Sequence, residues 1–137
     1  MGESKDINFD AVKEDWNIYK LEDGTVLKIK IVLVRIIQEG IDQIGNPMAG
    51  TLMNNVIVAI PPENLRNLKE IAPKFDLKFE IIKESWNEYS VEDGFILKIK
   101  PTLSQIDRLD KVDPRGDPLY RVLAQPNAKR IPKSKDK

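Results

Sequence analysis

The sequence predicts an all-β protein with one short helix, built from an internally duplicated three-stranded antiparallel meander. Two observations lead to this fold class. The chain repeats itself at an offset of 70 residues, and each copy alternates apolar with polar residues, which is the period of a strand. A three-stranded sheet is marginally stable alone. We therefore expect two meanders, related by a pseudo-twofold axis, to bury their apolar faces together in a barrel or a sandwich.

The repeat is clearest between residues 7–36 and residues 77–106. Fifteen of these thirty aligned positions are identical, and "WNIYKLEDGTVLKIK" in the first segment corresponds to "WNEYSVEDGFILKIK" in the second. Identity at half of the positions indicates a duplication. Residues that both copies keep are then those that the fold requires, and residues that differ are the candidates for function.

Each copy predicts a hairpin at its Glu-Asp-Gly sequence. A three-residue loop over residues 22–24 sets Tyr19 opposite Leu27, which keeps the large apolar residues on one face, whereas a two-residue loop mixes the faces. Gly24 and Gly94 are then expected in the left-handed conformation at a bulge. Short strands over residues 8–12 and 78–82 precede the two hairpins.

A second turn follows in each copy, at "DQIGNPM" (residues 42–48) and "DPRGDPL" (residues 113–119), where proline begins a third strand. We expect these third strands over residues 48–60 and 119–125. The intervening "PPENLRNLKEIAPKF" has proline near both ends and apolar residues at helical spacing. This pattern predicts a helix over residues 63–72.

These elements divide the chain into four parts. We expect a first β repeat over residues 1–61, a connecting helix over 62–73, a second β repeat over 74–128 and a disordered basic tail over 129–137. A single core shared by both repeats is favoured. The alternative is two SH3-like barrels in tandem, which at about 65 residues each would have thin cores.

The composition argues against an enzyme. The chain has no cysteine and no histidine, which excludes disulfides, Cys/His zinc sites, thiol nucleophiles and Ser-His triads. Asp110, Asp113 and Asp117 lack the spacing of a calcium loop. We expect no catalytic residue, no metal and no cofactor. The apolar runs are too short for a spanning helix and the N-terminus lacks a signal-peptide core, so we expect a cytoplasmic protein without a membrane partner.

The differences between the copies suggest a contact surface. Ile18, Val32 and Val34 of the first copy correspond to glutamate, threonine and serine in the second. The first copy therefore carries an apolar stripe on its outer face, where the second copy is polar. The predicted partner interface is Trp16, Ile18, Val32 and Val34. Either the connecting helix covers it, or a protein partner does, most simply a second copy of the chain.

Two further features distinguish the second copy. Pro101 replaces Ile31, which favours an edge strand there. Both copies also place a tryptophan beside lysines, and such a platform can bind single-stranded nucleic acid. The candidate contacts are Trp86, Lys98, Lys100, Lys129, Arg130 and Lys133. Nearby glutamates oppose this hypothesis. The first hypothesis is therefore a non-catalytic protein-interaction or assembly module, and the alternative is a nucleic-acid-binding β barrel.

Overall fold

The computed structural model describes residues 5–41, 43–44, 47–92 and 94–133. Within these ranges the chain is almost entirely β, with one 3-10 turn and no α-helix, and thus no helix that could span a membrane. The elements are β1 (Lys5–Ile7), β2 (Phe9–Lys13), β3 (Asn17–Leu21), β4 (Val26–Ile41), β5 (Pro47–Ile60), η1 (Glu63–Leu65), β6 (Phe79–Lys83), β7 (Asn87–Val91), β8 (Phe95–Val112) and β9 (Pro118–Pro132).

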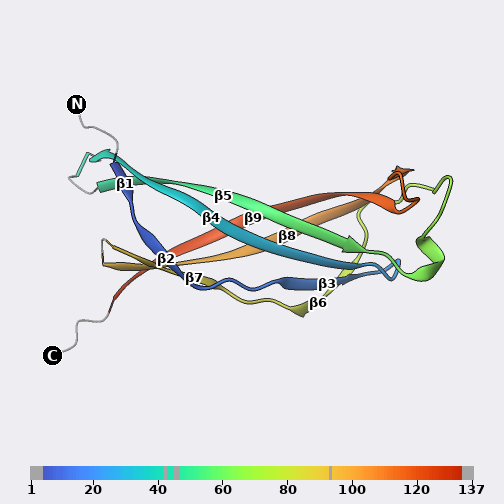
Figure 1. Cartoon of the computed structure of the whole chain (residues 1–137), viewed down its shortest axis with the longest axis horizontal. Helices are drawn as coiled ribbons and strands as arrows, with labels where there is room; N and C mark the ends of the chain where they lie inside the picture. The colour runs from blue at the N-terminus through green and yellow to red at the C-terminus, as the bar shows by residue number, and fades with distance from the viewer. Residues whose placement is uncertain (1–4, 42, 45–46, 93, 134–137) are drawn as a thin grey trace.

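Two antiparallel sheets form around two long hairpins, β4–β5 and β8–β9, which cross each other in Figure 1. In the first sheet, β4 pairs with β5 on one side and with β3 and β1 on the other, and β6 extends the sheet beyond β3. The second sheet has the order β2-β7-β8-β9. Over the described ranges neither sheet closes into a barrel, so the barrel alternative is not the observed architecture.

The predicted register of both short hairpins is confirmed. Tyr19 lies opposite Leu27, and Tyr89 lies opposite Leu97. Gly24 and Gly94 have φ angles of 93° and 98°, the left-handed region that a three-residue hairpin loop requires. The consequence is that one face of each hairpin points into the core, with Tyr19, Leu21, Leu27 and Ile29 buried in the first and Tyr89, Val91, Leu97 and Ile99 in the second.

The short strands that precede each hairpin pair with the hairpin of the other half of the chain. β2 pairs with β7, with Phe9 opposite Val91, and β6 pairs with β3, with Phe79 opposite Leu21. The predicted strands at residues 8–12 and 78–82 are therefore present, displaced by one residue. Each sheet thus contains a strand from the other half, which ties the two halves together by backbone hydrogen bonds.

The core consists of two clusters, and both sheets contribute to each. The first cluster contains Ile7, Ile31, Leu33 and Ile36 with Tyr89, Val91, Leu97 and Ile99. The second contains Tyr19, Leu21, Leu27 and Ile29 with Leu77, Leu103 and Ile106. A bulge between Leu33 and Arg35, and another between Leu103 and Gln105, switch which face of the strand is inward. Ile36 and Ile106 are buried beyond these bulges.

Polar side chains of β7 complete the hydrogen bonding of β4. β3 begins at Asn17, opposite Ile29, so the backbone at residues 31–33 pairs with β5 on one side and has no strand of the described first sheet on the other. Asn87 donates through Nδ2 to the Ile31 carbonyl at 2.7 Å, and the Leu33 N–H donates to the Tyr89 hydroxyl at 3.1 Å. The Tyr89 hydroxyl donates in turn to Glu14 Oε2 at 2.5 Å. Burial and this carboxylate raise the pKa of Tyr89 to about 12, so the hydroxyl stays protonated near neutral pH.

The predicted helix over residues 63–72 is wrong, because the segment forms only the η1 turn and then continues without regular secondary structure. Asn67 has a φ angle of 57°, which interrupts any helix. The Leu68 N–H donates to the Gly116 carbonyl, and the Lys74 and Leu77 N–H groups donate to carbonyls of β8. A ten-residue helix is marginal alone, so these tertiary hydrogen bonds prevail over its propensity.

Two other expectations at the second half are corrected. Residues 129–132 belong to β9, paired along β8 as far as Phe95 opposite Pro132, so the tail is not disordered there; residues 134–137 lie outside the described ranges. Pro101 lies in β8, an interior strand and not an edge. Proline is tolerated because β7 has already ended at Ile99, and Pro101 faces Pro126 across the β9 side.

The linker also encloses a buried carboxylate. Asp107 on β8 accepts hydrogen bonds from Gln105 Nε2 at 3.0 Å, from the Asp76 N–H at 2.8 Å and from Arg121 Nε at 3.2 Å. Asp107 is fully buried. These three donors favour the charged form and lower the pKa of Asp107 to about 2. The carboxylate therefore fastens the linker to the second sheet.

Replacing Tyr89 with phenylalanine should lower the free energy of unfolding by about 1–3 kcal/mol, because the buried Leu33 N–H loses its acceptor. The measurement is urea unfolding with an unchanged m-value. Tyr19→Phe is the matched control, since the Tyr19 hydroxyl binds Glu84 at 3.0 Å in a half-buried setting. A loss in Tyr89→Phe no larger than in Tyr19→Phe would contradict the assigned role of the hydroxyl.

Asp107 should make folding sensitive to acid. Its pKa in the folded state is about 2, below the value of about 3.9 in an unfolded chain, so the carboxylate stabilises the fold above pH 4. This contribution should disappear as the pH falls from about 4 through 2. Asp107→Asn should lower the urea midpoint at pH 7 and reduce its fall below pH 4. The exposed Asp10→Asn is the control, and equal pH profiles for both variants would refute the assignment.

Candidate interaction surfaces

The outer face of the first sheet carries a tryptophan between two lysines. Trp16 precedes β3, and the Nζ atoms of Lys28 and Lys30 lie 5.0 and 4.9 Å from its ring centroid. Ile18 lies opposite Lys28, as the sequence predicted. Such cation–π contacts contribute up to about 1 kcal/mol at exposed sites. Trp16 is thus half-covered by lysine stems and is not a freely presented aromatic.

The second sheet has a similar arrangement with more charge around it. The Nζ atoms of Lys100 and Lys129 lie 4.8 and 4.6 Å from the Trp86 ring centroid. Lys98 lies opposite Lys129 on the same face. Glu88 forms an ion pair with Lys98 at 4.0 Å, and Glu84 forms one with Lys100 at 3.4 Å. Two carboxylates therefore offset much of the positive charge at this face.

The other two predicted nucleic-acid contacts lie elsewhere. Arg130 is opposite Leu97, so strand alternation places it on the face opposite to Lys129, where its guanidinium lies 4.2 Å from the Phe95 ring centroid. Lys133 donates through Nζ to the Val91 carbonyl at 2.9 Å. The structure thus brings Trp86, Lys98, Lys100 and Lys129 together, and leaves Arg130 and Lys133 apart from them.

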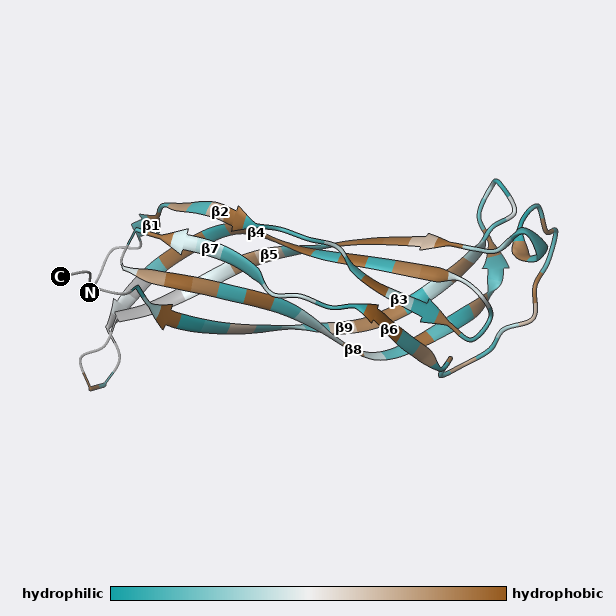
Figure 2. Ribbon diagram, turned by 90° about the horizontal axis from the view of Figure 1, so that it is seen from below, coloured by the Kyte–Doolittle hydropathy of each residue, from teal (hydrophilic) through white to brown (hydrophobic). Residues whose placement is uncertain are grey.

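The predicted apolar stripe lies on the outer face of β3 and β4 and extends onto β5. Trp16, Ile18 and Val32 are half-buried, whereas Val34 projects at the bulge and is exposed. β5 adds residues that the sequence prediction missed. We define the apolar face as Val34 with Leu52, Val56, Val58 and Ile60, whose exposed fractions range from 39% to 54%. Figure 2 shows the second half of β5 mostly in brown, the hydrophobic end of the scale.

A signal for β5 was present in the sequence. Residues 47–60, "PMAGTLMNNVIVAI", contain no charged residue, while the corresponding β9, "PLYRVLAQPNAKRIP", contains Arg121, Lys129 and Arg130. The run of identical positions ends at Ile36 and Ile106, and the predicted interface was taken from that run alone. The matching turns at residues 42–48 and 113–119 place the two third strands in correspondence, so the difference in their charge can be read from the sequence.

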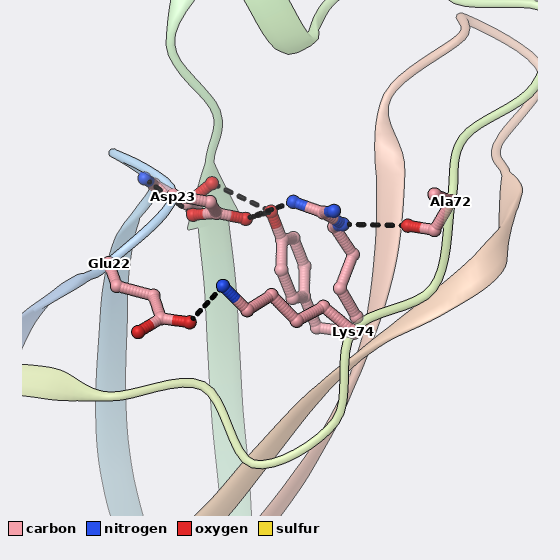
Figure 3. A network of polar contacts seen from close by, with 7 residues as sticks. Glu22, Asp23, Ala72 and Lys74 are labelled. Atoms are coloured by element: carbon pink, nitrogen blue, oxygen red, sulfur yellow. Dashed lines mark hydrogen bonds and ion pairs between the residues drawn. The ribbon is translucent and has the colours of Figure 1, made fainter.

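A separate polar network joins the β3–β4 turn to the second sheet (Figure 3). The Tyr120 hydroxyl donates to Asp23 Oδ2 at 2.7 Å, and Arg108 Nη1 lies 3.3 Å from the same oxygen. Beside it, Lys74 Nζ forms an ion pair with Glu22 Oε1 at 2.8 Å, and Arg108 Nε donates to the Ala72 carbonyl at 3.1 Å.

The chemistry of this network is structural in character. Desolvation opposes the charge on Asp23, but hydrogen bonds from the Thr25 N–H, Tyr120 and Arg108 outweigh it, and the pKa of Asp23 is lowered. Burial and the neighbouring carboxylate raise the pKa of Tyr120. The ionised Asp23 carboxylate and the protonated Tyr120 hydroxyl, each with partners inside the protein, hold the turn in place.

Comparisons with known proteins do not assign the chain to a family. In the part of the chain that the structure describes, no cluster of three or more acidic side chains could hold a metal ion. No protein-family model, curated protein or solved structure matches the chain.

Proposed function

We propose that the chain is a non-catalytic assembly module that associates with copies of itself through the outer side of its first sheet. The observation that carries this proposal is the apolar face, five exposed residues on two neighbouring strands. Lys28 and Lys30 lie opposite Val58 and Val56 and border this face. Exposed apolar residues gathered at one site are typical of protein contact surfaces. The stripe residues Trp16, Ile18 and Val32 would lie at the border of this contact.

The alternative cover for the stripe was the connecting helix. That helix does not form, and the linker instead runs against β8 and the Gly116 turn. A Cβ at Gly116 would lie 2.7 Å from the Leu68 nitrogen, so the linker is packed closely at that place. It is therefore engaged with the second sheet and is not available to cover β4 and β5. A second copy is the simplest remaining partner, because a twofold axis sets the same surface on both chains together.

We also infer that the two halves arose by duplication and are related by a pseudo-twofold axis. The matching registers of β3–β4 and β7–β8 support this inference, as do the bulges at residues 33–35 and 103–105. The reciprocal pairing of β2 with β7 and of β6 with β3 supports it further. Duplication would explain how one outer face could diverge for contact while the other kept the fold.

Self-association through the apolar face predicts a particle heavier than one chain by light scattering. The double variant Val56→Glu/Val58→Glu should be monomeric, because charges opposite one another at a contact repel and lose hydration. The matched control is Leu119→Glu/Leu123→Glu, two exposed apolar residues on β9, which should leave the mass unchanged. Circular dichroism checks that both variants are folded. A monomeric wild type, or a mass lowered equally by both variants, would overturn the proposal.

Nucleic-acid binding is the second candidate, and the cluster of Lys98, Lys100 and Lys129 around Trp86 favours it. Aromatic rings stack on bases, for about 1–3 kcal/mol each, while lysines neutralise phosphates. The ion pairs of Glu84 and Glu88 with these lysines weigh against it. Assembly therefore stays the first proposal.

If the Trp86 surface binds single-stranded oligonucleotides, the association constant should fall as salt rises. Lys129→Ala should make the plot of log association constant against log salt less steep by about 1. Substitution is the suitable test because deleting residues 129–137 would remove part of β9. The control is Lys30→Ala beside Trp16. Absence of binding at low salt, or equal effects of both substitutions, would exclude the Trp86 surface.

A further inference from the structure

We propose that the free edge of β5 is the seam of this assembly, and that β5 of a second copy pairs with it in antiparallel orientation. The two first sheets would then form one continuous sheet across a twofold axis. This inference rests on the proposed function and names the partner and the mode of contact.

β5 has an unused hydrogen-bonding edge. It is 14 residues long, and among the described residues it pairs only with β4, from Val26 opposite Ile60 to Ile41 opposite Pro47. Its other side presents a row of backbone N–H and C=O groups with no neighbouring strand from the described part of the chain. Such a row is a template for an added strand.

The exposure of β5 indicates a missing neighbour beside the strand and not a missing layer above it. Val56, Val58 and Ile60 lie on the outer face, and Ile57, on the inner face opposite Ile29, is also 41% exposed. Ile57 lines an open hollow with Leu119 and Tyr120 of β9, and this hollow reaches the free edge that a neighbouring strand would cover. A protein packed over the outer face would leave Ile57 in water. A strand beside β5 contacts residues of both faces, because successive side chains of a strand alternate.

The edge of β5 lacks the features that normally prevent strand addition. Natural edge strands carry lysine, proline or inward-pointing charges. β9, the corresponding edge of the second sheet, has Arg121, Pro126, Lys129 and Arg130 within it. β5 has no charge, and its only proline, Pro47, is its first residue. The same molecule therefore protects one edge and leaves the other open.

The chemistry of β5 suits a second copy of itself. Antiparallel self-pairing about an axis within residues 56–60 brings valine and isoleucine opposite valine, isoleucine and alanine. β-branched cross-strand pairs of this kind stabilise sheets. No like charges meet, since the strand has none. Self-pairing of β9 would instead bring its arginine and lysine side chains near those of the other copy.

Residue-resolved amide hydrogen exchange on the intact chain tests the seam, and light scattering reports the mass of the same samples. Concentrating the protein should slow alternate amides within residues 56–60 at least several-fold, because only the N–H groups on the free edge gain partners. The amides of β9 are the internal control and should not change. Ile57→Lys should abolish the dimer, since the inner face of β5 contacts the partner only in edge pairing.

The outcomes separate the seam from the proposed function. Two results would overturn the seam while self-association stands. One is a dimer in which the amides on the free edge of β5 exchange as fast as in the monomer, and the other is a dimer that persists in Ile57→Lys. A wild type that stays monomeric at all concentrations would overturn the proposed self-association as well. If Ile57→Lys fails to fold, the exchange measurement on the wild type decides alone.

Discussion

The structure depends on how the long strand β4 satisfies its backbone between its two shorter neighbours. Among the described residues, β3 pairs with residues 26–29 of β4 and β1 with residues 36–38, which leaves residues 31–33 without a strand on that side. A buried peptide group without a partner costs free energy comparable to a lost hydrogen bond. Asn87 and Tyr89 of the opposite sheet supply those partners. The two sheets are therefore held by polar contacts of fixed geometry as well as by apolar packing.

The pairing of β2 with β7 and of β6 with β3 also joins the two halves. Each short strand adds backbone hydrogen bonds to the sheet built by the other half, so neither sheet is complete without the whole chain. The linker, residues 66–78, joins the halves in the same way. Its backbone forms hydrogen bonds with β8 in place of helical ones, and the Asp76 N–H binds the buried Asp107 carboxylate. Local propensity is weak compared with several tertiary hydrogen bonds made at once.

The two sheets share a backbone plan and differ in what they present outward. The second sheet places Lys100 and Lys129 over Trp86 and pairs Lys98 and Lys100 with glutamates, and its edge strand carries charges. The first sheet shields Trp16 and leaves β5 apolar and uncharged. The hairpins and core residues that the two sheets share are explained by folding. The surface residues that differ are where selection for a contact would act, and these differences lie mainly on β5 and the apolar face.

The sequence by itself determined the hairpin registers, the left-handed glycines and the buried tyrosines, because two-residue periodicity and a glycine at a tight turn are local constraints. It could not decide which hairpin would accept β2 and β6, or that the linker would not form a helix. The sequence prediction grouped Arg130 with Lys129 because it expected a disordered tail from residue 129. In β9 these adjacent residues face opposite sides of the sheet. These outcomes depend on which backbone groups remain unpaired after the sheets meet, and only the tertiary structure determines that.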